Sequence, residues 1–183
     1  MNFIKRFTGH LRTVHKHRAM VRKLCFKCGL YWQGLTHDLS KYSPVEFWNG
    51  VRFYTGTCSP HVGERKKYGY SRAWMNHKAH NKHHAEYWQD IRPNGKTEPI
   101  DMPDRYFVEM ICDRVAASMI YKGPNYRDFE PLLYYMSHKD EHQFAPHTRE
   151  LLEYWLTNIQ NNGLDVAFEQ LKLYLKNKEN NLK

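Results

Sequence analysis

The sequence has no apolar run that approaches the ~20 residues needed for a membrane-spanning helix. Residues 1–6 include two basic side chains and none of the apolar stretch that a signal peptide carries. We therefore expect a cytoplasmic protein that has no membrane as a partner.

Cysteine is scarce, and its spacing is not that of a disulfide framework. Cys25 and Cys28 form a single CxxC motif, whereas a structural zinc site needs a second ligand pair at a similar spacing. We expect both thiols to lie inside a helix as small apolar side chains. The remaining two are Cys58 and Cys112.

Strand-like alternation and internal repeats are also missing, so helical periodicity dominates the pattern. Hydrophobic residues make up 41% of the chain and charged residues 26%, as in folded proteins with an adequate core. These features predict an all-α, compact helical bundle of about six to eight helices. We expect a single domain over residues 1–183, with a core at roughly 4–121 and C-terminal helices at 124–178.

Acidic residues are fewer than basic ones, and the net charge is +9 with histidine neutral. This balance favours an anionic partner, such as a nucleotide, a nucleic acid or a phosphate-rich substrate. A generic basic surface is an equally good explanation. Because the basic residues look scattered along the chain, no DNA-binding stripe is predicted, and nothing indicates the oligomeric state.

The first predicted helix runs from about Ile4 to Cys28 and stops at Gly29. Apolar residues recur along it at steps of three and four, and His17 occupies one of their positions. A histidine there is either a hydrogen-bonded core residue or a metal ligand. The His-Asp pair downstream favours the ligand.

That pair, His37 and Asp38, lies in the stretch from Gly34 to Pro44 with Lys41 three residues further on. Buried charges persist only when they are paired or metal-bound, so the stretch predicts a charged site. We expect a short helix to carry both His37 and Asp38. Another helix should follow over residues 44–54, with Glu46 in its first turn, and then a loop over residues 55–70 with a basic tip.

A long helix is predicted from Ser71 to about Arg92, and it carries a cluster of histidines. His77 and His84 are seven residues apart and would share a face, whereas His83 would point about 100° away from His84. His77 with His84, or a pair that uses His83, could bind an ion. The alternative is a histidine-rich helix that binds phosphates.

The helix that follows Asp101 has Asp113 between apolar positions, so we expect this carboxylate to be buried and to need a partner. Glu109 lies one turn earlier. It could orient a ligand histidine, or it could form a salt bridge with Arg105 or Arg114. Further helices are predicted at about 126–139, 146–162 and 164–178.

Read in chain order, the candidate ligands are His17, His37, Asp38, His77, His83, His84 and Asp113. This order resembles that of the HD-domain superfamily of metal-dependent phosphohydrolases, in particular its members with additional histidines. The residues at 34–47 and 73–88 also resemble a family of uncharacterised small proteins from phages and Gram-positive bacteria. The interval between Asp38 and His77 is long for the HD pattern, so this chain departs from the resemblance at His77.

The HD resemblance implies one ion held by His17, His37, Asp38 and Asp113, and a second ion held by His77, His83 or His84. It also implies that Asp38 and Lys41 are catalytic, with Lys41 stabilising charge on a phosphate.

Imidazole and carboxylate ligands suit Mn, Fe, Co, Ni or Zn. Lys78 and Lys82 are candidate substrate-binding residues. The predicted function is hydrolysis of a phosphoester, with a nucleotide-like compound as the favoured substrate. The alternatives are a di-iron oxidoreductase and a non-catalytic protein that binds a nucleotide or a partner.

Overall fold

The computed structural model describes residues 1–141 and 143–180. Within that part of the chain it has nine α-helices and one two-stranded hairpin, so the predicted all-α class is confirmed. The helices and strands are α1 (Phe3–Lys27), α2 (Tyr31–Thr36), α3 (Pro44–Phe53), α4 (Pro60–Tyr68), α5 (Arg72–His80), β1 (Gln89–Ile91), β2 (Thr97–Pro99), α6 (Asp104–Lys122), α7 (Glu130–Ser137), α8 (Pro146–Asn162) and α9 (Leu164–Asn180). Short 3₁₀ turns are η1 (Leu39–Tyr42), η2 (Ala85–Tyr87), η3 (Gly123–Asn125) and η4 (Lys139–Glu141).

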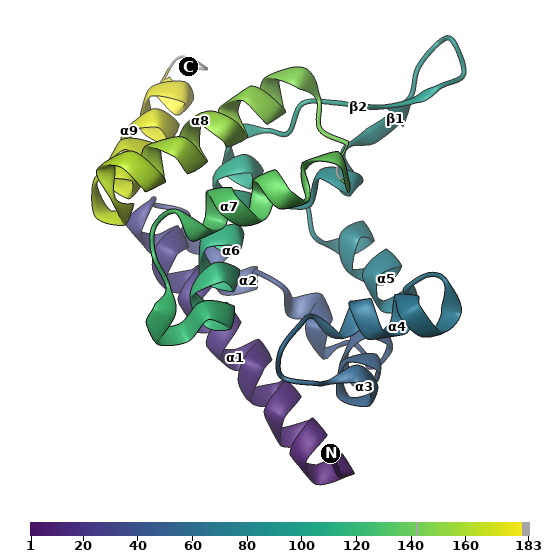
Figure 1. Cartoon of the computed structure of the whole chain (residues 1–183). Helices are drawn as coiled ribbons and strands as arrows, with labels where there is room; N and C mark the ends of the chain where they lie inside the picture. Colours follow the sequence, from purple (N-terminus) through teal and green to yellow (C-terminus); the bar gives the residue numbers. More distant parts are fainter. Residues whose placement is uncertain (142, 181–183) are drawn as a thin grey trace.

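Helices α1 and α6 pack against each other and form the axis of the molecule (Figure 1). Helices α8 and α9 pack together on one side of that axis, and α3, α4 and α5 form a second group on the other side. The N-terminal end of α1 extends beyond this second group, and the β1–β2 hairpin projects from the opposite end (Figure 1).

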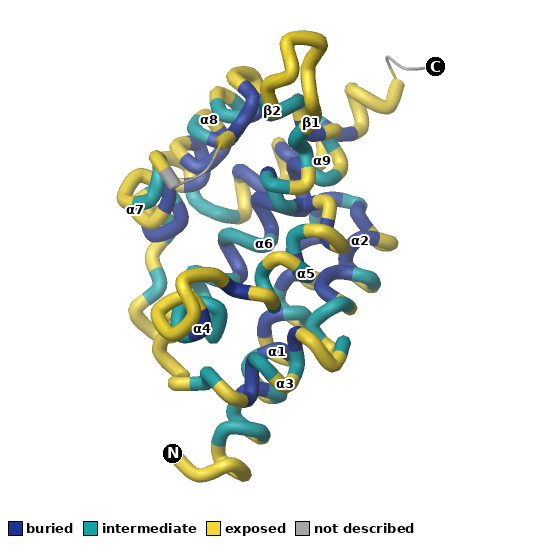
Figure 2. Tube along the Cα trace, turned by 90° about the vertical axis from the view of Figure 1, so that its right-hand side faces the viewer, coloured by how far each residue is buried: buried dark blue, intermediate teal, exposed yellow. Residues whose placement is uncertain are grey.

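The apolar core lies where α1 and α6 meet α8 and α9, and the buried segments cluster there in Figure 2. Its largest fully buried side chains include Phe107, Ile111, Leu152, Leu156, Phe168 and Leu171. Cys25 and Cys28 are buried in this core inside or at the end of α1. The expectation that they act as small apolar side chains therefore agrees with the structure.

Helix α1 follows its sequence pattern closely. The Asn2 side chain accepts a hydrogen bond from the Lys5 amide and caps its N-terminus. Val14, His17 and Val21 are buried on one face, as the periodicity predicts. The helix ends at Lys27, and Gly29 then adopts a φ of 78°.

Two regions differ from the prediction. Residues 60–68, expected to be part of a loop, form α4, because Pro60 suits the first turn of a helix and Gly69 suits its C-terminus. The helix expected from Ser71 to Arg92 ends instead at His80. The following chain turns at η2 and then pairs β1 with β2 around a turn that contains Gly95.

The C-terminal helices lie close to their predicted positions. Helix α7 is shorter than expected, whereas α8 has the predicted bounds and α9 continues to Asn180. Among the helices of residues 1–141 and 143–180, none combines the length and the apolar character that a bilayer crossing requires.

Candidate metal centre

The backbone turns sharply at the His-Asp pair. Helix α2 ends at Thr36, His37 is its C-cap, and Asp38 has φ 54° and ψ 31°, in the left-handed region. Asp is one of the few residues besides glycine that visit this region readily. The Arg18 guanidinium donates to the backbone carbonyls of His37 at 2.8 Å and Leu35 at 3.1 Å and so fixes the turn. The prediction that one helix carries both His37 and Asp38 is therefore wrong.

This turn buries the Asp38 carboxylate at the middle of the molecule, with 1% of its surface exposed. Its Oδ2 atom lies 3.6 Å from Nε2 of His17 and 3.4 Å from Nε2 of His37. Asp113 completes this group, with Oδ1 at 3.0 Å from His17 Nε2 and 3.5 Å from His37 Nε2. The four residues that the HD resemblance assigns to one ion therefore lie together.

The other carboxylate oxygen of Asp38 faces a second group of histidines. Oδ1 lies 3.4 Å from Nε2 of His77 and 3.5 Å from Nε2 of His83. The His84 ring packs beside both, with its centroid 4.7 Å from that of His77 and 4.2 Å from that of His83. Asp38 thus faces one set of imidazoles with each oxygen, and the two sets meet where the ring centroids of His37 and His83 lie 4.4 Å apart.

His83 and His84 both join this group because the helix ends before them. Asn81 leaves helical geometry with φ −123° and ψ 104°. Its side-chain amide donates to the carbonyl of His77 and to Ser40 Oγ, both at 2.7 Å, which holds the turn against the His-Asp stretch. The expected divergence of His83 from His84 on a straight helix is therefore wrong.

Two glutamates contact three of the histidines at Nδ1, on the side of the ring away from Asp38. The Nδ1 atoms of His37 and His83 lie 2.9 Å and 3.2 Å from Oε1 of Glu109. Nδ1 of His77 lies 2.8 Å from Oε2 of Glu46. Donation from each Nδ1–H to its carboxylate directs the Nε2 atom toward Asp38, where its lone pair could bind a cation placed between the imidazole and the carboxylate. Of the two roles predicted for Glu109, its position fits the orientation of ligand histidines.

The charges of the cluster reinforce one another. Burial alone would raise the pKa of Asp38, but the neighbouring His37 and Lys41 outweigh it and hold that pKa well below its usual range. The pKa of His37 is raised despite burial, because Asp38, Asp113 and Glu109 surround it. The Lys41 ammonium lies 2.9 Å from Asp38 Oδ2, and its pKa is raised although burial opposes this. Lys41 therefore stays protonated.

The donor atoms fit a metal ion. One ligand atom from each of His17, His37, Asp38 and Asp113 lies within 4.8 Å of the others, and the same holds for Asp38, His77, His83 and His84. Oδ1 of Asp38, Nε2 of His83 and Nε2 of His84 are buried and make no hydrogen bond. Buried polar atoms without a partner are unfavourable, and a cation would satisfy all three. The buried cluster could therefore hold a metal ion.

The two remaining lysines take different positions. Lys82 places its Nζ 5.7 Å from the ring centroid of Tyr87 and 5.6 Å from that of Tyr106, so it contacts aromatic rings. Lys78 follows His77 directly on α5 and is half-buried. Their assignment to substrate binding stays a prediction.

The structure also identifies supporting residues that the sequence pattern did not single out. Ser40 and Asn81 join the two motifs, although they are separated by 41 positions in the chain. Their only sequence signal is that each lies inside a ligand-rich stretch.

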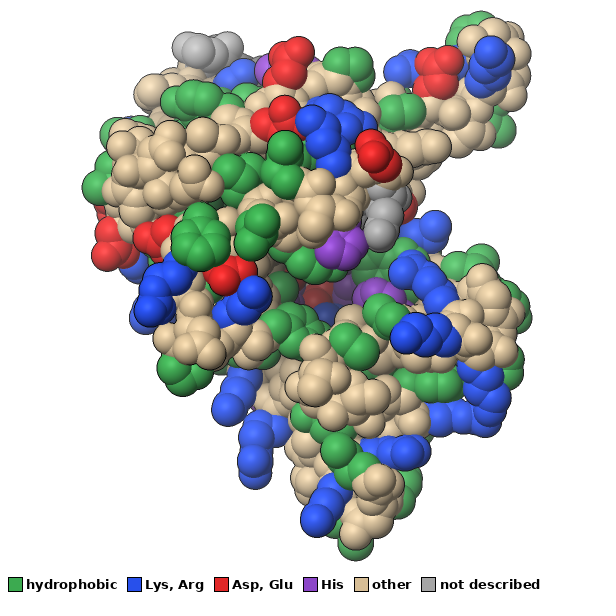
Figure 3. Space-filling view, in the orientation of Figure 1, with side chains coloured by type: hydrophobic (Ala, Val, Ile, Leu, Met, Phe, Trp, Pro, Cys, Tyr) green, Lys and Arg blue, Asp and Glu red, His purple; other side chains and the backbone are tan. Residues whose placement is uncertain are grey.

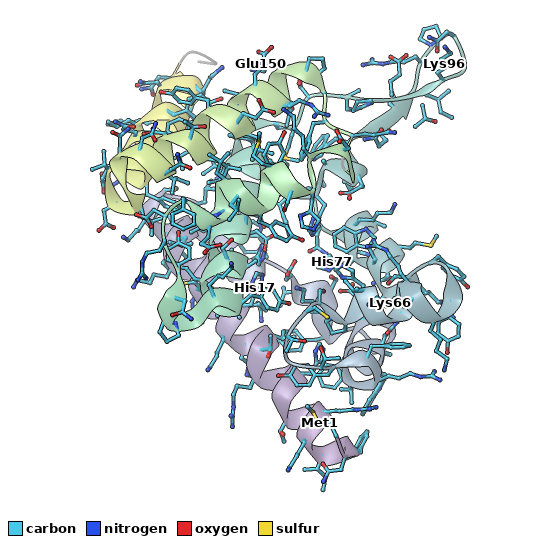
Figure 4. All side chains as sticks on the ribbon, in the orientation of Figure 1. Met1, His17, Lys66, His77, Lys96 and Glu150 are labelled. Carbon is cyan, nitrogen blue, oxygen red and sulfur yellow. The ribbon has the colours of Figure 1, made fainter. Side chains whose placement is uncertain are left out.

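The cluster lies at a hollow in the molecular surface. Figure 3 shows this hollow between the half that contains α7 and the half that contains α4 and α5, with histidine side chains on its walls. His77 points into it from α5, and His17 approaches from α1 (Figure 4). Basic side chains lie on the α4 side, where Lys66 is labelled.

Residues 6–158 match the model of DUF5662, a family of unknown function, and the chain belongs to this family. Searches among curated proteins and among solved structures found no match. The family description gives no activity.

Proposed function

We propose that the protein is a metal-dependent hydrolase of phosphoesters, with a nucleotide-like compound as substrate. One observation carries the proposal: the buried Asp38 carboxylate faces a different set of imidazoles with each oxygen. A carboxylate between two nitrogen-rich ligand sets suits a pair of ions, and two-metal sites are common in phosphoryl-transfer enzymes. The order of these residues also resembles the HD-domain superfamily.

His17, His37 and Asp113 would hold one ion with Asp38, and the histidines of residues 77–84 would hold the other. Mixed imidazole and carboxylate donors favour Mn, Fe, Co, Ni or Zn over Mg alone. Bound ions would polarise a phosphoryl oxygen and lower the pKa of a bound water to about 7. Glu46 and Glu109 would keep the ligand imidazoles in the tautomer that presents Nε2.

Lys41 has a separate role in this proposal. Its side chain is 31% exposed while its ammonium contacts the buried Asp38, so the residue lies at the boundary between the cluster and solvent. Because its pKa is raised, it cannot act as a proton acceptor near neutral pH. It would instead balance the negative charge that develops on a phosphate during hydrolysis.

The test is elemental analysis of protein purified without chelators, followed by a phosphoester screen with added Mn, Fe or Zn. Asp38→Asn removes the shared carboxylate charge, and Asp165→Asn is the matched control because Asp165 is exposed and pairs with Lys27 far from the cluster. We expect one or two transition-metal ions per chain in the wild type and the control, none in Asp38→Asn, and phosphate release that follows the metal.

Wild-type protein that binds no metal and stays inactive after metal addition would sink the proposal. Oxygen consumption without phosphate release would replace it with the di-iron oxidoreductase. Metal binding without either reaction would favour a non-catalytic binding protein. A cytoplasmic location, which we expect from the sequence, would place the enzyme among soluble nucleotides.

A further inference from the structure

The two halves of the chain carry opposite net charge. Residues 1–85 contain 16 Lys and Arg but 3 acidic residues, a net charge of +13, whereas residues 86–183 contain 12 and 16, a net charge of −4. The three acids of the first half are Asp38, Glu46 and Glu64, and all are buried. The surface of residues 1–85 therefore shows basic groups and no carboxylate side chain, so the basic residues are not evenly scattered as expected.

Large apolar side chains are exposed on the same half, around α2. We call this surface the α2 strip and define it by Phe26, Tyr31, Trp32, Leu35, Leu39 and Tyr42. Trp32 is 71% exposed and Leu35 51% exposed, values typical of side chains with little cover. An exposed apolar group of this kind, bordered by polar residues, often marks an interaction surface.

Contacts along α1 join the strip into one surface. The rings of Phe26 and Tyr31 lie 5.2 Å apart. At the other end, the Arg18 guanidinium bonds the Leu35 carbonyl and lies 5.1 Å from the Tyr42 ring centroid. Arg22 is exposed on α1 midway between Arg18 and Phe26, four residues from each, so it borders the strip. Exposed apolar groups and fixed positive charges therefore share one face.

The chemistry of this face discriminates between occupants. A second copy of the chain would bring its own positive charges against it, which opposes self-association. A nucleic acid would use the cations and the aromatic rings but would leave Leu35 and Leu39 without a role. At a membrane interface, Trp and Tyr lie at the headgroup level, leucine reaches the acyl boundary, and Arg and Lys contact anionic headgroups.

We propose that the α2 strip docks the protein onto an anionic lipid surface. Helix α2 and helix α7 lie on opposite sides of the molecule (Figure 2), so docking would leave the α7 side of the hollow uncovered. The earlier expectation of no membrane partner rested on the lack of a spanning segment, and surface docking needs none. This proposal does not depend on the hydrolase function.

The experiment is co-sedimentation of the full chain with vesicles of phosphatidylcholine, alone or mixed with phosphatidylserine. We expect binding to the mixed vesicles only. The binding should be lost between about 0.1 M and about 1 M NaCl, as the Debye length falls from about 10 Å to about 3 Å. The variants are Trp32→Ser with Leu35→Ser, and Arg22→Glu; each should weaken binding at least about tenfold.

Leu133→Ser with Tyr134→Ser is the matched control, because these α7 side chains are 55% and 57% exposed on the opposite side. Circular dichroism and metal content should equal those of the wild type in every variant. Absence of binding to the mixed vesicles would overturn the proposal, as would equal loss in the α7 control. A dimer broken by the strip variants, or capture of a single-stranded oligonucleotide in place of vesicles, would overturn it too.

Discussion

The α1–α6 pair buries opposite kinds of side chain toward α8 and α9 and toward α5, and we call these two parts its apolar end and its charged end. Toward α8 and α9, the pair contributes apolar residues such as Val21 and Phe107, both 0% exposed. Toward α5, the same two helices contribute His17, which contacts Asp38, and Asp113, which contacts His17. One helix pair therefore supplies both the stability of the fold and the position of its charged cluster.

The energetic consequences of the two ends differ in sign. Full burial of one large apolar side chain contributes about 1.5–3 kcal/mol. A buried polar atom without a hydrogen bond costs about 1–3 kcal/mol, and the charged end contains three such atoms among its candidate ligands. Apolar burial at one end therefore offsets the unfavourable free energy of the charged end. A bound ion would reduce that unfavourable contribution.

The largest effect should come from the apolar end. Phe107→Ala leaves a cavity in the core between α6 and its neighbours, and we expect the free energy of unfolding to fall by about 3–5 kcal/mol. Chemical denaturation measures this loss. The metal content per folded chain should stay unchanged; a variant that folds but loses its metal would show that the two ends are not separable.

At the charged end, stability should depend on metal. Added Mn or Zn at 100 times its Kd should raise the free energy of unfolding of the wild type by about 2.7 kcal/mol, because an ion that binds only the folded state stabilises it. Thermal unfolding with and without metal measures the increment. Asp38→Asn should show none, whereas Phe107→Ala should show the wild-type increment. An equal increment in Asp38→Asn would exclude Asp38 as a ligand.

A smaller effect is expected from the supporting glutamates. Glu46→Gln and Glu109→Gln keep the shape of each side chain but weaken the acceptor for a ligand histidine. We expect metal affinity to fall about 10–100-fold, measured by competition with a chelator. Glu64→Gln is the matched control, since Glu64 is a buried glutamate that accepts from Ser71. If all three variants lose affinity alike, the effect would be one of general stability.

The smallest effect concerns pH, at a histidine outside both ends. Burial beside Gly50, with a contribution from Lys41, lowers the pKa of His10 to about 4. His10 is therefore neutral in the folded state, while the unfolded chain takes up a proton below pH 6.5. The stability that it contributes is present above pH 6.5 and is lost as pH falls toward 4.

This prediction is measured as the unfolding midpoint of wild type and His10→Gln between pH 7 and 4. The wild type should lose more stability than the variant over that window. His80→Gln, at an exposed histidine, should behave as the wild type does. Parallel pH profiles for the wild type and His10→Gln would contradict the assignment.

Regular helices explain what the sequence could predict. Periodicity alone placed His17 on the buried stripe of α1 and Asp113 on the inward side of α6, because each lies in an uninterrupted helix. Asp113 is less buried than expected, with 18% of its side chain exposed. At 37–38 and 77–84 the residue spacing indicated a charged site and an ion-binding histidine pair, the resemblance divided these residues between two ions, and the structure brings them together.

The predictions of helix bounds were wrong where side-chain contacts, rather than periodicity, determine the backbone conformation. The continuation of α5 beyond His80 looked favourable, but the Asn81 amide bonds Ser40, far away in the chain, and the helix stops. No local pattern reports such a contact. By contrast, Ser59-Pro60 before α4 was a usable N-terminal signal, and it was missed because nearby glycines suggested a loop.

The left-handed backbone at Asp38 limits which substitutions this family can tolerate at that position. Among the described residues, Asp38 is the sole non-glycine with positive φ. Position 38 therefore has two separate requirements: a carboxylate, and a short side chain that tolerates a left-handed backbone. Asp113 lies in a right-handed helix and has only the first requirement. Replacement of aspartate by glutamate should thus be found more often among family members at position 113 than at position 38.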